Sequence, residues 1–130
     1  MAVLITGGWR DNKGLQSAEI FNIDTNQSLF LPKLSQSKFY HTQEDNYACG
    51  GYETDISNSE TDTCQKWDND TETWTQSHML TGSRYGHVSW STSFGVYLMG
   101  GAISGNEKTS EVMKNDGTVE KGFDLRYDTV

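Results

Sequence analysis

Short apolar segments that end in paired glycines divide this chain at similar distances. The segments VLIT before Gly7-Gly8 and GVYLM before Gly100-Gly101 are the clearest, and NYAC before Gly50-Gly51 is a weaker example. Apolar runs of this length, bounded by glycine, are typical of buried β-strands. Each glycine pair is therefore expected to close an inner strand, where the chain turns in a crowded space that has no room for a Cβ atom.

The sequence between the glycine pairs repeats with one constant offset. Ala18 to His41 aligns without a gap on Cys64 to His87, at a shift of 46 residues. In this register the pair Asp24-Thr25 meets Asp70-Thr71, and His41 meets His87. A third, shorter copy follows at residues 109–125, where Asp116-Gly117 replaces the Asp-Thr pair. The chain thus reads as repeats at about 1–46, 47–96 and 97–130, the last incomplete.

Each repeat is expected to contain four short antiparallel strands. In the second unit the first two strands are predicted at Gly86–Ser91 and Val96–Met99, and in the earlier unit the third is predicted at Cys64–Trp67. The fourth begins near Trp74, after a hairpin turn at Asp70-Thr71. Four-stranded sheets that recur every 40 to 50 residues are the signature of propeller blades. The predicted fold is all-β, with about two and a half four-stranded antiparallel blades.

The repeats resemble those of the kelch family, in which an apolar strand ends in Gly-Gly and two aromatic positions follow. Trp67 and Trp74 fill both aromatic positions, whereas Phe21 fills only the first and the last copy has neither. The resemblance implies a partial kelch-type β-propeller in which His41 and His87 are structural. Propellers close with about four to eight blades, so we expect the remaining blades to come from a longer protein or from further chains.

Composition and charge exclude two classes of partner. The net charge is −8 and the ten lysines and arginines are scattered, so neither nucleic acid nor an anionic membrane surface is expected as a partner. No apolar run is long enough to insert into a membrane. Two glycosylation sequons, at Asn26 and Asn69, are about as many as chance provides. The compartment is left open.

The two cysteines, Cys49 and Cys64, form no metal-binding or redox motif. The favoured interpretation is that both are small, buried, apolar side chains. A disulfide between neighbouring strands is the main alternative, and a reactive thiol is a third.

The chemical motifs we considered are incomplete. GWRDNKG, from Gly8, lacks the order of residues in a phosphate-binding loop, and DNDTE, from Asp68, lacks the glycine and glutamate of a calcium loop. His78 is expected on the surface. We therefore predict no catalytic residue, cofactor or metal.

The expected function is that of a protein-interaction module of the scaffold or adaptor type. In kelch proteins, the loops after the glycine pairs and the loops between repeats build the partner-binding face. The residues predicted to contact a partner, which would be a protein or acidic peptide, are Trp9, Arg10, Lys38, Tyr52, Glu53, Asp55, Arg84 and Tyr85. For Lys38 and Arg84 the alternative is that they only tie blades together. The alternative function is a fragment of a galactose-oxidase-like copper enzyme.

Overall fold

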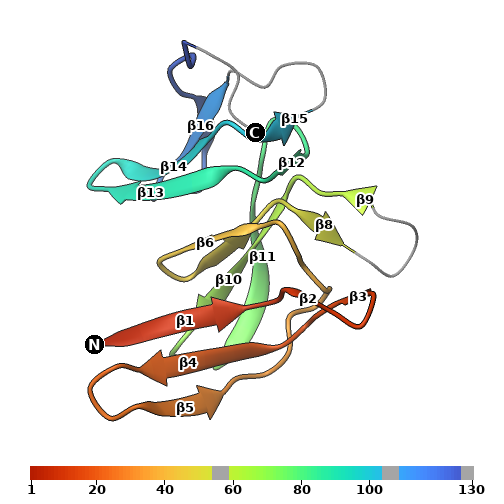
Figure 1. Ribbon diagram of the computed structural model, residues 1–130. Helices are drawn as coiled ribbons and strands as arrows, with labels where there is room; N and C mark the ends of the chain where they lie inside the picture. The colour runs from red at the N-terminus through yellow and green to blue at the C-terminus, as the bar shows by residue number, and fades with distance from the viewer. Residues whose placement is uncertain (54–58, 104–108, 127–130) are drawn as a thin grey trace.

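The computed structural model describes residues 1–53, 59–103 and 109–126, and Figure 1 shows three antiparallel sheets that follow one another along the chain. We call them blades 1, 2 and 3. Blade 1 contains β1 (Ala2–Thr6), β4 (Ala18–Asn22) and β5 (Gln27–Phe30). Blade 2 contains β6 (Thr42–Glu44), β7 (Tyr47–Cys49), β10 (Thr63–Asp68) and β11 (Thr73–Met79). Blade 3 contains β13 (Val88–Thr92), β14 (Gly95–Met99), β16 (Ser110–Met113) and β17 (Val119–Lys121).

Small two-stranded elements lie at one end of the blades, along one side of the molecule (Figure 1). Two of them are the hairpins that follow the first two glycine pairs, formed by β2 (Trp9–Arg10) with β3 (Lys13–Gly14) and by β8 (Tyr52–Glu53) with β9 (Ser59–Glu60). The third pairs β12 (Arg84–Tyr85), from the loop between blades 2 and 3, with β15 (Ala102–Ile103). These loops form what we call the loop side.

The predicted fold class is confirmed: the described residues form a partial, propeller-like, all-β fold without a helix. The three-stranded sheet is the first, however, and not the last. In blades 2 and 3 the first strand, β6 or β13, comes before the strand that ends at a glycine pair. This first strand lies at the end of the preceding sequence repeat, so the boundaries of the sheets and of the repeats differ. Among the described residues no helix is both long and apolar enough to cross a membrane.

The glycine pairs lie where the blades meet. Gly7 and Gly50 both have positive φ, at 61° and 65°. A Cβ on Gly7 would overlap the carbonyl oxygen of Lys38, and a Cβ on Gly50 would overlap that of Arg84. The prediction that these turns have no space for a side chain is therefore confirmed.

The aromatic positions of the repeat face each other across the third and fourth strands. Trp67 is directly opposite Trp74, with ring centroids 5.4 Å apart. The same position pairs Phe21 with Ser28 in blade 1 and Met113 with Val119 in blade 3. Residues that align in the sequence repeats thus occupy equivalent paired positions in the three sheets.

A buried apolar core joins blades 2 and 3. Its residues are Cys49, Cys64, Leu80, Val96, Leu98 and Met113. Cys49 and Cys64 lie opposite each other on β7 and β10 and form a disulfide. The favoured interpretation of two unpaired thiols was therefore wrong, although both residues are buried as expected. Both sulfurs contact the Sδ atom of Met113, at 3.5 and 3.3 Å.

Candidate functional site

Lys38 joins blade 1 to blade 2. Its side chain is fully buried, and its Nζ lies 3.0 Å from a carboxylate oxygen of Glu53. The same Nζ is within 3.3–3.4 Å of the carbonyl oxygens of Gly50 and Thr63 and of the Thr63 hydroxyl. Burial lowers the pKa of Lys38, and the charge of Glu53 opposes this shift. We call this contact the first joint.

Arg84 makes the equivalent contact between blades 2 and 3. Its guanidinium is fully buried and donates to the carbonyl oxygens of Gly100 and Thr109, at 2.6 and 2.8 Å. It also lies 3.3 Å from the carboxylate of Glu111, which is itself 1% exposed. Burial lowers the pKa of Arg84, and the charge of Glu111 opposes the shift. We call this contact the second joint.

These two joints require a correction to the predicted partner-binding residues. Lys38 and Arg84 have no exposed side-chain surface, so they do not lie on a surface that a partner could reach. Each instead extends into the following blade, which was the alternative interpretation of the sequence.

A histidine lies at each joint. His41 Nε2 is 2.9 Å from the Thr6 hydroxyl, and His87 Nε2 is 2.7 Å from the Thr42 hydroxyl. Burial, together with the nearby charge of Lys38, lowers the pKa of His41 to about 4. Burial and the charge of Arg84 lower that of His87 to about 3. The two rings are therefore neutral packing residues near pH 7.

His78 does not lie on the surface as expected. It is 6% exposed, and its Nε2 is 3.0 Å from the carbonyl oxygen of Lys114 in blade 3. Its Nδ1 is 2.7 Å from the Ser77 hydroxyl. This histidine, too, connects two blades.

Aromatic side chains gather on the loop side. Phe39 contacts Trp9 and Tyr52, with ring centroids 4.6 and 5.1 Å apart, and Tyr52 contacts Tyr85 at 4.6 Å. Tyr40 lies beside Phe39 and Tyr52. A pocket of about 470 Å³ is lined by Trp9, Phe39, Tyr40, Tyr52 and Glu60. We call these five residues and Tyr85 the aromatic surface.

Three of the predicted contact residues, Trp9, Tyr52 and Tyr85, belong to the aromatic surface. Trp9 is 50% exposed and Tyr40 is 67% exposed, whereas Phe39 is buried beneath them. A hydrogen bond with Tyr85 raises the pKa of Tyr52 to about 12, so its hydroxyl is neutral at physiological pH. The surface thus combines exposed rings, tyrosine hydroxyls and the carboxylate of Glu60.

Sequence reasoning missed Tyr40 and Glu60. Tyr40 has a positive φ of 52°, and the equivalent position in the next repeat is Gly86, with φ of 63°. A non-glycine residue in this conformation is unfavourable and worth a functional explanation. The offset of 46 residues, which aligns Tyr40 with Gly86, was the signal that could have identified it.

The remaining predicted contact residues lie apart from the aromatic rings or in an ion pair. Arg10 is exposed and lies 3.4 Å from Asp11. Glu53 is occupied by Lys38 at the first joint. Asp55 lies outside the described residues.

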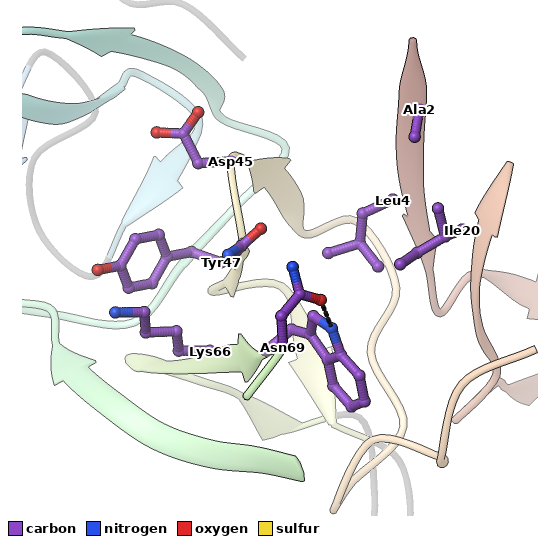
Figure 2. A pocket seen from close by; sticks show the side chains of 9 residues that line it. Ala2, Leu4, Ile20, Asp45, Tyr47, Lys66 and Asn69 are labelled. Atoms are coloured by element: carbon purple, nitrogen blue, oxygen red, sulfur yellow. Dashed lines mark hydrogen bonds between the residues drawn. The ribbon is translucent and has the colours of Figure 1, made fainter. Parts of the chain in front are cut away.

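A second hollow of about 490 Å³ lies between blades 1 and 2 (Figure 2). Leu4 and Ile20 line it from blade 1, and Tyr47, Lys66 and Trp67 line it from blade 2. The polar groups on the blade 2 side contact one another: Trp67 Nε1 donates to Asn69 at 2.7 Å, and Lys66 Nζ lies 5.5 Å from the centre of the Tyr47 ring. These are contacts that hold a blade edge in place, so the aromatic surface is the stronger candidate site.

In the part of the chain that the structure describes, no group of three or more His, Cys, Asp or Glu residues is arranged to hold a metal ion.

Fold and surface together define a partial, propeller-like, all-β protein with an aromatic pocket on its loop side. No family model and no curated protein matches the chain, so the resemblance to kelch repeats stays a prediction. The solved structure of YjhT is similar, with 12% sequence identity and a TM-score of 0.76. The match covers 96% of this chain and 49% of YjhT, so the chain spans about half the length of that protein. At this identity the similarity concerns the fold alone.

Proposed function

We propose that the chain is a protein-interaction module of the kelch type, without chemistry of its own, whose aromatic surface binds a segment that carries Arg or Lys. The observation that carries the proposal is the pocket lined by four aromatic side chains and Glu60. Large aromatic side chains are enriched where proteins bind one another, because they bury much area at small entropic cost.

A basic segment fits this pocket better than the acidic peptide expected from the sequence. Two of the three cations predicted to face a partner, Lys38 and Arg84, are buried. What remains is a carboxylate beside exposed rings, and Arg or Lys binds favourably over the face of Trp or Tyr. The net charge of −8 also attracts a basic partner at a distance.

Tyr40 offers support that is independent of the pocket. The backbone at this position suits glycine, which the next repeat has at Gly86. An exposed tyrosine here contributes strain to the folded state, which is explained if its ring has a binding role. The side chain is then kept for recognition and not for stability.

The test is binding of short synthetic peptides that differ only in one central residue, Arg, Lys, Gln or Glu, measured by isothermal titration calorimetry. We expect the Arg and Lys peptides to bind and the Glu peptide to bind least. Tyr40→Gly should weaken binding of the Arg peptide about tenfold, or ~1.4 kcal/mol, while leaving the free energy of unfolding the same or higher. Glu60→Gln should reduce the preference for Arg over Gln.

The matched control is Phe94→Ala. Phe94 is 76% exposed in the turn between β13 and β14, which lies away from the loop side (Figure 1). Its removal should leave peptide binding unchanged. Equal binding of the Arg and Glu peptides, or equal loss in Phe94→Ala and Tyr40→Gly, would contradict the proposal.

A further inference from the structure

One face of blade 1 points away from blade 2. Its residues occupy the repeat positions that, in blade 3, pack against the neighbouring blade. Leu4 and Ile20 line the hollow next to blade 2, so the alternate residues of these strands lie on the opposite face. On that face Val3, Ile5 and Phe21 occupy the repeat positions that Val96, Leu98 and Met113 occupy in blade 3. The three blade 3 residues are buried in the core against blade 2, whereas Val3 is 39% and Ile5 is 44% exposed.

The same face of blade 1 also carries residues equivalent to those that contact Arg84 at the second joint. Arg84 contacts Gly100, Thr109 and Glu111 of blade 3. The equivalent residues of blade 1 are Gly7, Ser17 and Glu19, because Gly7 N bonds to Ser17 O as Gly100 N bonds to Thr109 O. A pocket of about 110 Å³ lies at this place, lined by Ile5, Ser17, Ala18, Glu19 and Phe30. Its lining residues include no lysine or arginine, whereas at the two joints such a side chain fills the equivalent place.

Blade 3, at the opposite end of the described structure, presents an aromatic face and a cation that complement this face of blade 1. Leu98 and Glu111 of blade 3 face blade 2, so Trp90 and Tyr97, which alternate with them in register, face away. Trp90 is 67% exposed. Beyond β17 the sequence Arg126-Tyr127 repeats the cation–aromatic pairs Lys38-Phe39 and Arg84-Tyr85. Arg126 is exposed.

We propose that a second copy of this chain packs its blade 3 onto blade 1, with its Arg126 in the pocket beside Glu19, so that two chains close one ring. Glu19 and Arg126 have opposite charges and stand at the repeat positions of an ion pair that the second joint forms. The same contact made twice, in head-to-tail order, closes a two-chain ring.

The test is the solution mass of the purified 130-residue chain, by sedimentation or light scattering over a range of concentrations. We expect a species of twice the 14.6 kDa chain mass. Glu19→Arg and Arg126→Glu should each raise the dissociation constant of the dimer by about 30-fold or more, because each places like charges together at a buried pair. The double variant Glu19→Arg/Arg126→Glu should restore the dimer.

Lys66→Glu is the matched control, because Lys66 is basic, exposed and lies on β10 of blade 2, which carries neither of the two faces. Its dissociation constant should equal that of the wild type. Circular dichroism should show the same strand content for all variants. A wild-type species of 14.6 kDa at every concentration would overturn the proposal and assign the face to blades outside these 130 residues. A dimer that neither single variant weakens would also overturn it.

Discussion

The first and second joints place a cation at the same repeat position but neutralise it differently. At the second joint Glu111 projects from β16, is 1% exposed and pairs with Arg84. The equivalent residue at the first joint is the neutral Gln65, which accepts a hydrogen bond from Ser35 N as Glu111 accepts one from Thr81 N. The charge on Lys38 is instead balanced by Glu53, from the hairpin after the glycine pair, and this carboxylate is 16% exposed.

The difference shows which part of the joint the fold requires. Both joints keep an acceptor on the third strand and a cation that reaches the carbonyl oxygen of a glycine, at Gly50 or Gly100. The carboxylate can come from a strand or from a loop. A fully buried pair is more sensitive to the loss of one partner than a partly solvated one.

The largest expected effect comes from breaking the second joint. Glu111→Gln should lower the free energy of unfolding by about 3–5 kcal/mol, because Arg84 would remain buried without a countercharge. The matched variant at the first joint, Glu53→Gln, should cost less, about 1–3 kcal/mol, because solvent reaches this carboxylate although Lys38 itself is buried. Equilibrium denaturation in urea measures both values. Equal losses would remove the distinction between the joints.

The next effect concerns the disulfide in the core between blades 2 and 3. Cys49→Ala/Cys64→Ala should lower the free energy of unfolding by about 2–4 kcal/mol, because the unfolded chain is no longer constrained. Urea denaturation with and without a reductant provides the measurement. The reductant should destabilise the wild type and leave the double variant unchanged. A wild type that is insensitive to reductant would speak against the bridge.

The smallest effect at neutral pH is a dependence of stability on pH that arises from one histidine at each joint, and it grows to a few kcal/mol as the pH is lowered. The pKa values of His41 and His87 are about 4 and about 3 in the folded chain, below the ordinary value of about 6.5. The unfolded chain therefore binds more protons between these values, and stability falls as the pH is lowered from about 6.5. Each histidine contributes a slope of about 1.4 kcal/mol per pH unit.

Histidine variants separate this contribution from that of the carboxylates, which also titrate in this range. His41→Gln and His87→Gln should each make the loss of stability between pH 6 and pH 4 less steep, as measured by denaturation at a series of pH values. The neighbouring charges are Lys38 for His41, and Arg84, His41 and Lys38 for His87. Lys38 and Arg84 remain in both variants, whereas His41→Gln also removes one neighbour of His87. An unchanged slope in both variants would contradict the assignment.

Much of the fold was predictable because a repeat is visible in the sequence. The offset of 46 residues places Trp67 opposite Trp74, and the glycine pairs mark where strands meet a neighbouring backbone. Such constraints are local, so a single sequence records them. The disulfide was harder to predict from the sequence, because two cysteines in a polar chain are equally compatible with separate burial.

The candidate site was predicted only in part, because exposure is a property of the assembled blades. Lys38 and Phe39 are adjacent, and the sequence alone did not indicate that both would be buried. Their recurrence as Arg84 and Tyr85 was a sign of a structural role, of the kind that was recognised for His41 and His87. Glu60 reaches the aromatic surface through the β8–β9 hairpin, whose pairing brings it opposite Tyr52.

Tyr40 aligns with Gly86, and Tyr52 aligns with Ala102. Equivalent loop positions therefore carry an aromatic ring in one repeat and no large side chain in the next, while the strands stay the same. A Cβ on Gly86 would have no atom within 4 Å, and Tyr85 already stands beside Ala102 in the pairing that joins Phe39 to Tyr52. Tyrosines introduced at Gly86 and Ala102 would extend the row of rings by one blade, with backbone strain at residue 86, where φ is 63°, as at Tyr40. If the aromatic surface binds as proposed, its recognition chemistry can be moved from one repeat to the next by two substitutions.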